Sequence, residues 1–254
     1  MPVELYKKGD HLVVSFNDLV KGEGIQSNQL LIKHGHHSAL LDPGGDLTFM
    51  PLNIAIGKYE PLKELDYVLA SHQDPDIVSA LDKWLMHTNA KVVVSKLWVR
   101  FIHHLIPSFM ADKTKDRILA IPDEGMDLPL GRSVIKLIPA HFLHSPGNFH
   151  FYDPVSKILF SGDVGASMVT DAPDRPVRDF ARHVKKMQGF HQRYMTSNKA
   201  CRLWVKMVRQ LDVEMIVPQH GRPFKGEIIG KFLDWFEKLE CGVDRINEQT
   251  YQIP

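Results

Sequence analysis

Three apolar strand candidates are each followed directly by a potential metal ligand, and this feature strongly limits the folds open to the chain. They are Asp66 to Ala70 followed by His72, Ile158 to Phe160 followed by Asp163, and Glu214 to Val217 followed by His220. Strand ends of one sheet gather at one edge, so the loops that leave them can converge on a common point. A fourth segment, which contains His144, precedes a strand candidate at Phe149. The pattern therefore predicts one ligand-rich edge.

The other apolar patterns mix strands and helices in both halves of the chain. Short β-prone runs predict further strands at Leu12 to Phe16, Gln29 to Lys33, Ser38 to Leu41, Lys91 to Val94, Ile118 to Ile121, Ser133 to Ile138 and Phe149 to Tyr152. Helical spacing predicts helices at Ile77 to Met86, Leu97 to Leu105, Val177 to Met187, Asn198 to Leu211 and Ile228 to Leu239. The first three strands suggest an antiparallel meander. Without repeats or linker-like tracts, we expect a single domain over residues 1–254, an α/β (α+β) sandwich of sheets covered by helices.

Charge and cysteine content give no support for a polyanionic partner or for a disulfide-rich fold. Lys and Arg number 31 against 30 Asp and Glu, for a formal charge of +1. This balance gives no electrostatic reason to expect nucleic acid or an acidic membrane. Two cysteines are too few for a disulfide framework, and neither a signal peptide nor a membrane-spanning apolar run is evident. We expect a cytoplasmic protein whose 14 histidines include metal ligands.

His72, Asp74 and Asp76 alternate in an irregular stretch just before a predicted helix. Alternate positions of an extended loop point the same way, so His72 and Asp74 can reach a common centre. Asp76 also lies where a helix N-cap belongs, and capping is an alternative role for it.

Together the four segments resemble the motifs of the metallo-β-lactamase superfamily. The matching stretches are His72-Gln73-Asp74-Pro75-Asp76-Ile77, His144-Ser145-Pro146-Gly147, Ser161-Gly162-Asp163 and Gln219-His220-Gly221. Their order and spacing agree over roughly residues 10–225. The resemblance implies an αββα sandwich, in which two mixed sheets are flanked by helices.

Two departures from the hydrolase motif identify a branch of that superfamily. Asp74 stands where most of the hydrolases have a second histidine, and Ile77 where they have the last one. The chain therefore resembles the di-iron module of flavodiiron proteins, and most of all the stand-alone oxygen-binding di-iron proteins without a flavodoxin domain.

This resemblance implies a set of ligands for two iron ions. One iron would take His72, Asp74 and His144, and the other Asp76 and His220. Asp163 would bridge them, beside an oxo, hydroxo or peroxo bridge. Ile77 cannot be a ligand, so the second iron keeps open positions.

The donor set favours hard, oxidisable metals. Three neutral imidazoles and three carboxylates place about three negative charges around two cations, which suits iron or manganese better than zinc. No Gly-rich phosphate loop follows a strand, so we expect no FMN in this chain.

Two functions are compatible with these residues. The first is a non-haem di-iron protein that binds O2 or NO, as an oxygen or redox sensor or as a slow O2 or NO reductase with a separate electron donor. The alternative is a metal-dependent hydrolase of a lactone, thioester or phosphodiester that uses a metal-bound hydroxide. A purely structural metal is a third interpretation. The resemblance also implies a head-to-tail homodimer and a signalling partner from chemotaxis or a nucleotide second-messenger system.

Other polar residues have candidate roles around the metals. His141 and His150 flank the His144 segment and could donate hydrogen bonds to ligand carboxylates. Tyr194 or His191 could line the ligand pocket, where a hydroxyl would stabilise a bound peroxide by a hydrogen bond. Their run of sequence lacks clear helical spacing, and packing in the core is the alternative role for Tyr194.

Overall fold

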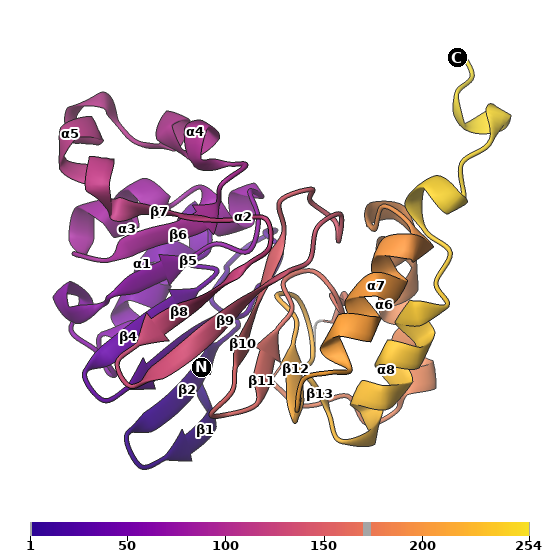
Figure 1. The fold of residues 1–254 in the computed structure, drawn as a ribbon, viewed down its shortest axis with the longest axis horizontal. Helices are drawn as coiled ribbons and strands as arrows, with labels where there is room; N and C mark the ends of the chain where they lie inside the picture. Colours follow the sequence, from indigo (N-terminus) through magenta and orange to yellow (C-terminus); the bar gives the residue numbers. More distant parts are fainter. Residues whose placement is uncertain (1, 170–173, 254) are drawn as a thin grey trace.

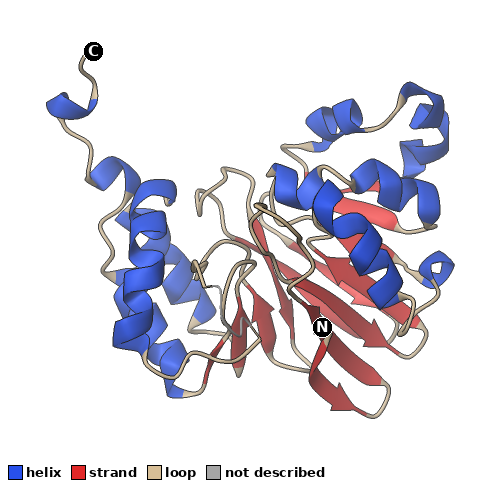
Figure 2. Ribbon diagram, turned by 180° about the vertical axis from the view of Figure 1, so that it is seen from behind, coloured by secondary structure: helices blue, strands red, loops and turns tan. Residues whose placement is uncertain are grey.

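The computed structural model describes residues 2–169 and 174–253, in which two β-sheets lie face to face with helices on their outer sides (Figure 1, Figure 2). The first sheet has seven strands in the order β1 to β7. These strands are β1 (Val3–Lys8), β2 (His11–Phe16), β3 (Gln29–His34), β4 (His37–Leu41), β5 (Tyr67–Leu69), β6 (Lys91–Ser95) and β7 (Ile118–Ile121). The first four pair antiparallel, as the expected meander, and β4 to β7 pair parallel.

The second sheet has six strands in the order β13-β12-β11-β10-β9-β8. They are β8 (Met126–Leu130), β9 (Ser133–Pro139), β10 (Phe149–Asp153), β11 (Ile158–Phe160), β12 (Met215–Val217) and β13 (Phe224–Lys225). Only β11 and β12 pair parallel, so this sheet is mixed as well.

Helices lie on the outer faces of both sheets (Figure 1). Those beside the first sheet are α1 (Asp46–Ile56), α2 (Pro75–Val78), α3 (Leu81–His87), α4 (Val99–Ile102) and α5 (Ala111–Thr114). Those beside the second are α6 (Phe180–Tyr194), α7 (Asn198–Val208) and α8 (Glu227–Glu237). Short 3-10 turns occur at Leu62–Glu64, His103–Leu105, Ser108–Met110, Lys115–Arg117, Gly242–Asp244 and Glu248–Thr250. No helix in the described ranges is both long and apolar enough to cross a membrane.

Three apolar layers hold the sandwich together. One packs α1 and α3 on the first sheet through residues such as Leu52 and Trp84. A second fills the space between the sheets, with Phe149 and Phe151 among its members, and a third packs α6 to α8 on the second sheet. The layers confirm the predicted αββα sandwich of two mixed sheets flanked by helices.

Several predicted elements were wrong in extent. The predicted helix Ile77 to Met86 is divided between α2 and α3, and Leu97 to Leu105 contains only the short α4 and a 3-10 turn. The helix predicted at Val177 to Met187 begins at Phe180 and continues to Tyr194. Its buried stripe is His183, Met187 and His191, so two of its three inward positions are histidines that an apolar count does not register.

Strand direction places the functional residues. Parallel pairing makes β4 and β5 end at one edge of the first sheet, and β11 and β12 end at the matching edge of the second. The loops that leave these four strands carry Asp42, His72, Asp163 and His220, as the strand-end pattern predicted for the last three.

Candidate metal centre

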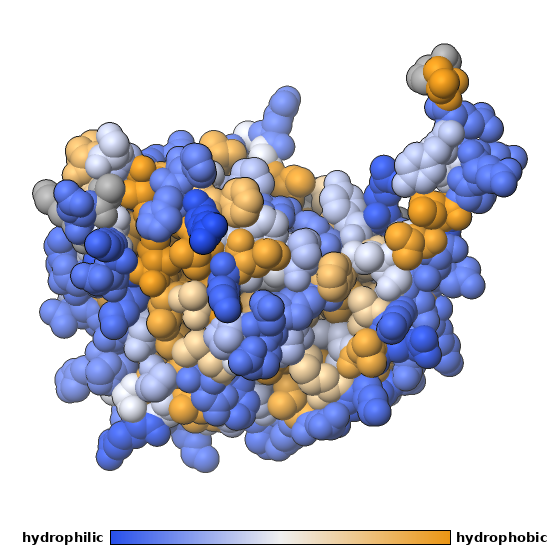
Figure 3. All heavy atoms as spheres, turned by 45° about the horizontal axis from the view of Figure 1, so that its top comes forward, coloured by the Kyte–Doolittle hydropathy of each residue, from blue (hydrophilic) through white to orange (hydrophobic). Residues whose placement is uncertain are grey.

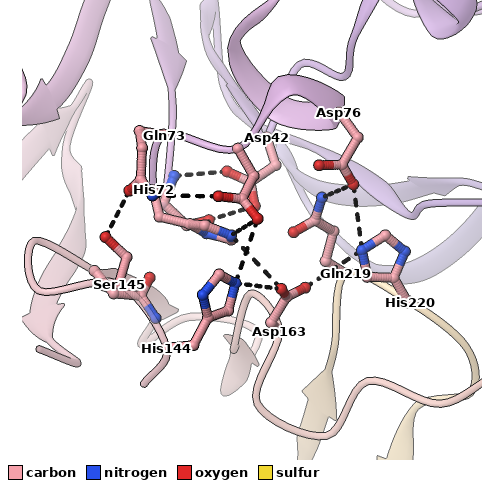
Figure 4. A network of polar contacts seen from close by, with 12 residues as sticks. Asp42, His72, Gln73, Asp76, His144, Ser145, Asp163, Gln219 and His220 are labelled. Carbon is pink, nitrogen blue, oxygen red and sulfur yellow. Dashed lines mark hydrogen bonds and ion pairs between the residues drawn. The ribbon is translucent and has the colours of Figure 1, made fainter. Parts of the chain in front are cut away.

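Asp163 lies at the centre of a cluster of three histidines between the ends of the two sheets (Figure 4). Its Oδ2 is 2.9 Å from Nε2 of His144 and 3.6 Å from Nε2 of His72. Its Oδ1 is 3.3 Å from Nε2 of His220. The two oxygens of one carboxylate therefore face different imidazoles, which is the arrangement that a bridging ligand needs.

The loop after β5 contributes one carboxylate to each side of Asp163. Oδ2 of Asp74 lies 3.4 Å from Nε2 of His144 and 3.6 Å from Nε2 of His72. Oδ2 of Asp76 lies 3.3 Å from Nε2 of His220. One group thus combines His72, Asp74 and His144, the other combines Asp76 and His220, and Asp163 belongs to both.

The start of α2 explains how this loop separates its two carboxylates. Asp74, not Asp76, occupies the N-cap position, and Pro75 follows at the first helical position, where its missing N–H costs nothing. The Asp74 side chain accepts no capping hydrogen bond, so it stays available to the imidazoles. Asp76 lies in the first turn and does not cap the helix.

Asp42 and Ser71 orient the imidazole of His72. The Ser71 hydroxyl donates to Oδ2 of Asp42 over 2.7 Å and lies 2.9 Å from Nδ1 of His72. Since that hydroxyl has only one hydrogen, it accepts from Nδ1–H, so the neutral imidazole of His72 carries its lone pair on Nε2. Asp42 was not predicted as part of the site, although it follows an apolar strand in the same way as the strand-end ligands do.

Backbone and amide groups orient the opposite side in the same manner. Nδ1 of His220 donates to the carbonyl of Gln26 over 2.7 Å, which leaves its Nε2 free to bind a cation. The amide of Gln219 donates to Oδ2 of Asp76 over 3.1 Å. Neither role was predicted from the sequence, because Gln219 is an ordinary amide beside a ligand and Gln26 contributes only a backbone carbonyl from 194 residues away.

Mutual attraction shifts the pKa values of the whole cluster. Burial disfavours the charged imidazole of His72, but the nearby carboxylates of Asp163 and Asp74 outweigh burial and raise its pKa to about 10. The same balance raises the pKa of His144 to about 9 and of His220 to about 10. Burial alone would raise the pKa of Asp163, yet the three imidazoles hold it well below its usual value. The carboxylates therefore stabilise positive charge at this site. Protons on the imidazoles supply that charge when no metal is bound.

The donor set fits metal cations. Nε2 of His72 and Oδ1 of Asp163 are buried and have no hydrogen-bond partner among the described residues. The ligand atoms of His72, Asp74, His144 and Asp163 all lie within 4.8 Å of one another. Unpaired buried polar atoms cost free energy that coordination to a cation would recover.

Tyr194 and His191, the candidate residues for the ligand pocket, lie beside the ligand cluster but not in it. The Tyr194 ring meets the His144 ring edge to face at 5.5 Å and remains 53% exposed. His191 is buried, and its Nε2 accepts from the backbone N–H of Gly165, two residues beyond Asp163.

His141 and His150 are not brought to the ligand carboxylates. Nε2 of His141 donates to the carbonyl of Asp123 over 2.7 Å, and its ring packs on Phe149. His150 is fully buried and its Nδ1 accepts from the indole of Trp204 over 2.9 Å. Burial lowers the pKa of His150 to about 3, so its imidazole is neutral.

An αββα sandwich with this His and Asp cluster at one sheet edge defines a metallo-β-lactamase-fold protein with a binuclear type of site. A family model described as "ODP family beta lactamase" matches residues 25–221, and the chain belongs to that family.

Two solved structures of the family are similar along almost their whole length. One is described as "Peroxy diiron species of chemotaxis sensor ODP", with 41% identity, a TM-score of 0.87 and coverage of 98% of this chain and 99% of that one. The other is "Apo state of chemotaxis sensor ODP from T. denticola", with 40% identity, a TM-score of 0.86 and coverage of 99% of both chains.

More distant similarities extend to larger proteins. Rubredoxin oxygen:oxidoreductase of Desulfovibrio gigas shares the fold at 15% identity and a TM-score of 0.76, over 94% of this chain and 61% of that one. A curated protein of Methanocaldococcus jannaschii, MJ0732, is 30% identical over 84% of this chain, which spans only 53% of its length.

Proposed function

We propose that this protein binds two iron ions between its sheet ends and senses O2 through them. The bridging position of Asp163, with three imidazoles and two further carboxylates around it, is the observation that carries the proposal. The "peroxy diiron" description of a structure that is 41% identical supports iron as the metal and O2 as the ligand. NO is a second diatomic gas that open iron positions would admit.

The residues divide into two sets of ligands with one in common. His72, Asp74 and His144 would hold one iron, Asp76 and His220 the other, and Asp163 both. Iron in such a site supplies reversible redox chemistry and open positions for a diatomic gas.

Residues around the ligands would leave the second iron with fewer protein ligands and would fix the tautomers of two histidines. Ile77 follows Asp76 but is fully buried in the apolar layer under α2, so it offers no ligand atom. Ser71, Asp42 and the Gln26 carbonyl keep His72 and His220 in the tautomer whose Nε2 can bind metal.

Sensing is favoured over rapid reduction. Both similar structures are described as a chemotaxis sensor and are covered over 99% of their length. A sensor needs a signalling partner, for which chemotaxis components are the first candidates, and slow reduction would need a separate electron donor. We further propose a cytoplasmic location.

A homodimer is part of the proposal. Figure 3 shows apolar side chains gathered among hydrophilic ones on the face that carries the helices of the first sheet. The exposed apolar side chains include Phe101 at 62% and Phe109 at 72%. Exposed apolar area of this kind is what a second copy would cover.

Oxygen titration of the anaerobically reduced, iron-loaded protein tests the function. We expect a visible absorption band that grows with O2 and saturates, and its loss in Asp74→Ala. Asp116→Ala, an exposed aspartate remote from the centre, is the matched control and should keep the band. An O2-insensitive protein that hydrolyses a chromogenic ester would overturn the proposal.

A further inference from the structure

A small cavity beside the N-terminal half of α6 lies outside the metal centre and has an unusual lining. Its volume is about 230 Å³. Besides Val177 and one acidic residue, Asp179, its lining residues are all basic: Arg178, Arg182, His183, Lys186 and Arg222. Four cationic side chains and one histidine around so small a space point to an anion as the ligand.

The basic charge is concentrated here and not spread evenly over the chain. Residues 174–193 contain six lysines and arginines but two aspartates, whereas the whole chain has a formal charge of only +1. Arg178 and Arg182 are exposed on this wall and form no ion pair with any described residue. Unneutralised arginines on a cavity wall offer planar donor pairs that match phosphate oxygens.

The start of α6 adds to this positive potential. The helix has 15 residues, and its first backbone N–H groups carry the positive end of the helix dipole. The Asp179 side chain accepts only from the backbone N–H of Arg182, so it caps one of these donors and leaves others available.

His183 provides an independent sign of a ligand. It lines the cavity, is only 6% exposed, and its Nε2 has no hydrogen-bond partner among the described residues. Burial, together with the charges of Arg222 and Lys186, lowers the pKa of His183 to about 4. A neutral imidazole with an unpaired buried nitrogen is costly unless a ligand completes its hydrogen bonding.

We propose that this cavity binds the phosphoryl group of a small molecule, held by Arg178 and Arg182 with His183 and the start of α6. The volume is below the roughly 300 to 1,000 Å³ of pockets for drug-sized ligands, so it accommodates a phosphoryl group and little more. Inorganic phosphate and the terminal group of a nucleotide share this chemistry.

Calorimetric titration of the iron-loaded protein with inorganic phosphate, at constant ionic strength, tests the proposal. We expect saturable binding of one phosphate per chain, weakened tenfold or more in Arg178→Ala and in Arg182→Ala. Lys185→Ala is the matched control, because Lys185 is exposed on the same helix but does not line the cavity. Circular dichroism should show the same fold in all four proteins.

Three other outcomes would contradict a phosphate site in this cavity. Binding at full strength in both arginine variants would place phosphate elsewhere, at the irons for instance, and overturn the proposal. Equal weakening in Lys185→Ala would show that phosphate binds to a diffuse basic surface. A titration without saturable binding would show that the cavity does not bind phosphate. Titration with AMP then separates the sources, since tighter binding than phosphate indicates a nucleotide and weaker binding indicates the free ion.

Discussion

Two buried clusters of histidine and aspartate lie at opposite ends of the sandwich, and they differ in how their polar atoms are satisfied. One is the Asp163 cluster at the ends of β5, β11 and β12. The other joins the start of β2 to the end of β10, where Nε2 of His11 lies 2.7 Å from Oδ2 of Asp153. Both His11 and Asp153 are almost fully buried.

The His11 cluster is closed. Asp153 accepts from the backbone N–H groups of Val155 and Ser156 and from the Ser156 hydroxyl, besides His11. Nδ1 of His11 lies 3.1 Å from Nδ1 of His34. Each polar atom of the buried pair has a partner, so the cluster needs nothing further to be stable.

The Asp163 cluster, in contrast, has buried polar atoms that no described residue satisfies with a hydrogen bond. His72 and His220 are held at Nδ1, while the Nε2 atoms of all three histidines converge on shared carboxylates at up to 3.6 Å. A structural cluster and a metal-binding cluster can thus contain the same residue types, and unpaired, convergent polar atoms distinguish the second from the first.

The largest expected effect comes from Asp163→Ala. Removing the carboxylate that faces all three histidines should abolish binding of both irons, because each would lose a ligand and the positive imidazoles would repel one another. Iron analysis after gel filtration measures this, with circular dichroism as the control for folding. Retention of both irons would contradict the bridging role.

His11→Ala should have the opposite profile. It leaves Asp153 buried without its partner, so we expect the free energy of unfolding to fall by about 3 to 5 kcal/mol. Iron content per folded chain should not change. Urea unfolding and iron analysis measure the two quantities, and a loss of iron would remove the distinction between the clusters.

A smaller effect is expected for Ser71→Ala. Without the hydroxyl that fixes the His72 tautomer, iron affinity should fall by about 10- to 100-fold. Ser156→Ala is the matched control, since its hydroxyl serves the closed cluster and should leave iron affinity unchanged. Competition with a coloured chelator measures both variants, and equal affinities would contradict the orienting role of Ser71.

The pH dependence of stability sharpens the comparison further. The raised pKa values of His72, His144 and His220 stabilise the metal-free protein below pH 6.5, and this contribution is lost as the pH rises towards 9 to 10. Iron replaces these protons and binds more tightly as they leave. The difference in Tm between iron-loaded and metal-free protein should therefore widen from pH 6.5 to 9. Parallel curves would contradict the protonated cluster.

The apolar patterns predicted sheets covered by helices and the residues at strand ends, because side-chain periodicity is local, whereas the αββα order of layers was implied by the family resemblance. The sequence did not predict the elements whose formation depends on tertiary packing. Helix α1 was missed because Leu47, Met50 and Ile54 are exposed, so its apolar residues surround it and give no helical stripe. Strand β8 was missed because Pro129 lies in it, which an edge strand tolerates.

The candidate ligands could be read from sequence, but the groups that orient them could not. Asp42 is 29 residues from Ser71, and Gln26 is 194 residues from His220. Such contacts arise only when the two sheets pack together, and serine or backbone carbonyl partners carry no spacing signal. The role of Tyr194 beside the metals stays a prediction, whereas His141 donates to the Asp123 carbonyl and not to a ligand carboxylate.

Metal content and an optical spectrum test the central claim most directly. The protein would be purified without added metal, reduced, and re-exposed to air. We predict close to two irons per chain and a visible band that appears only with oxygen. Two zincs and a colourless protein in both states would contradict the account.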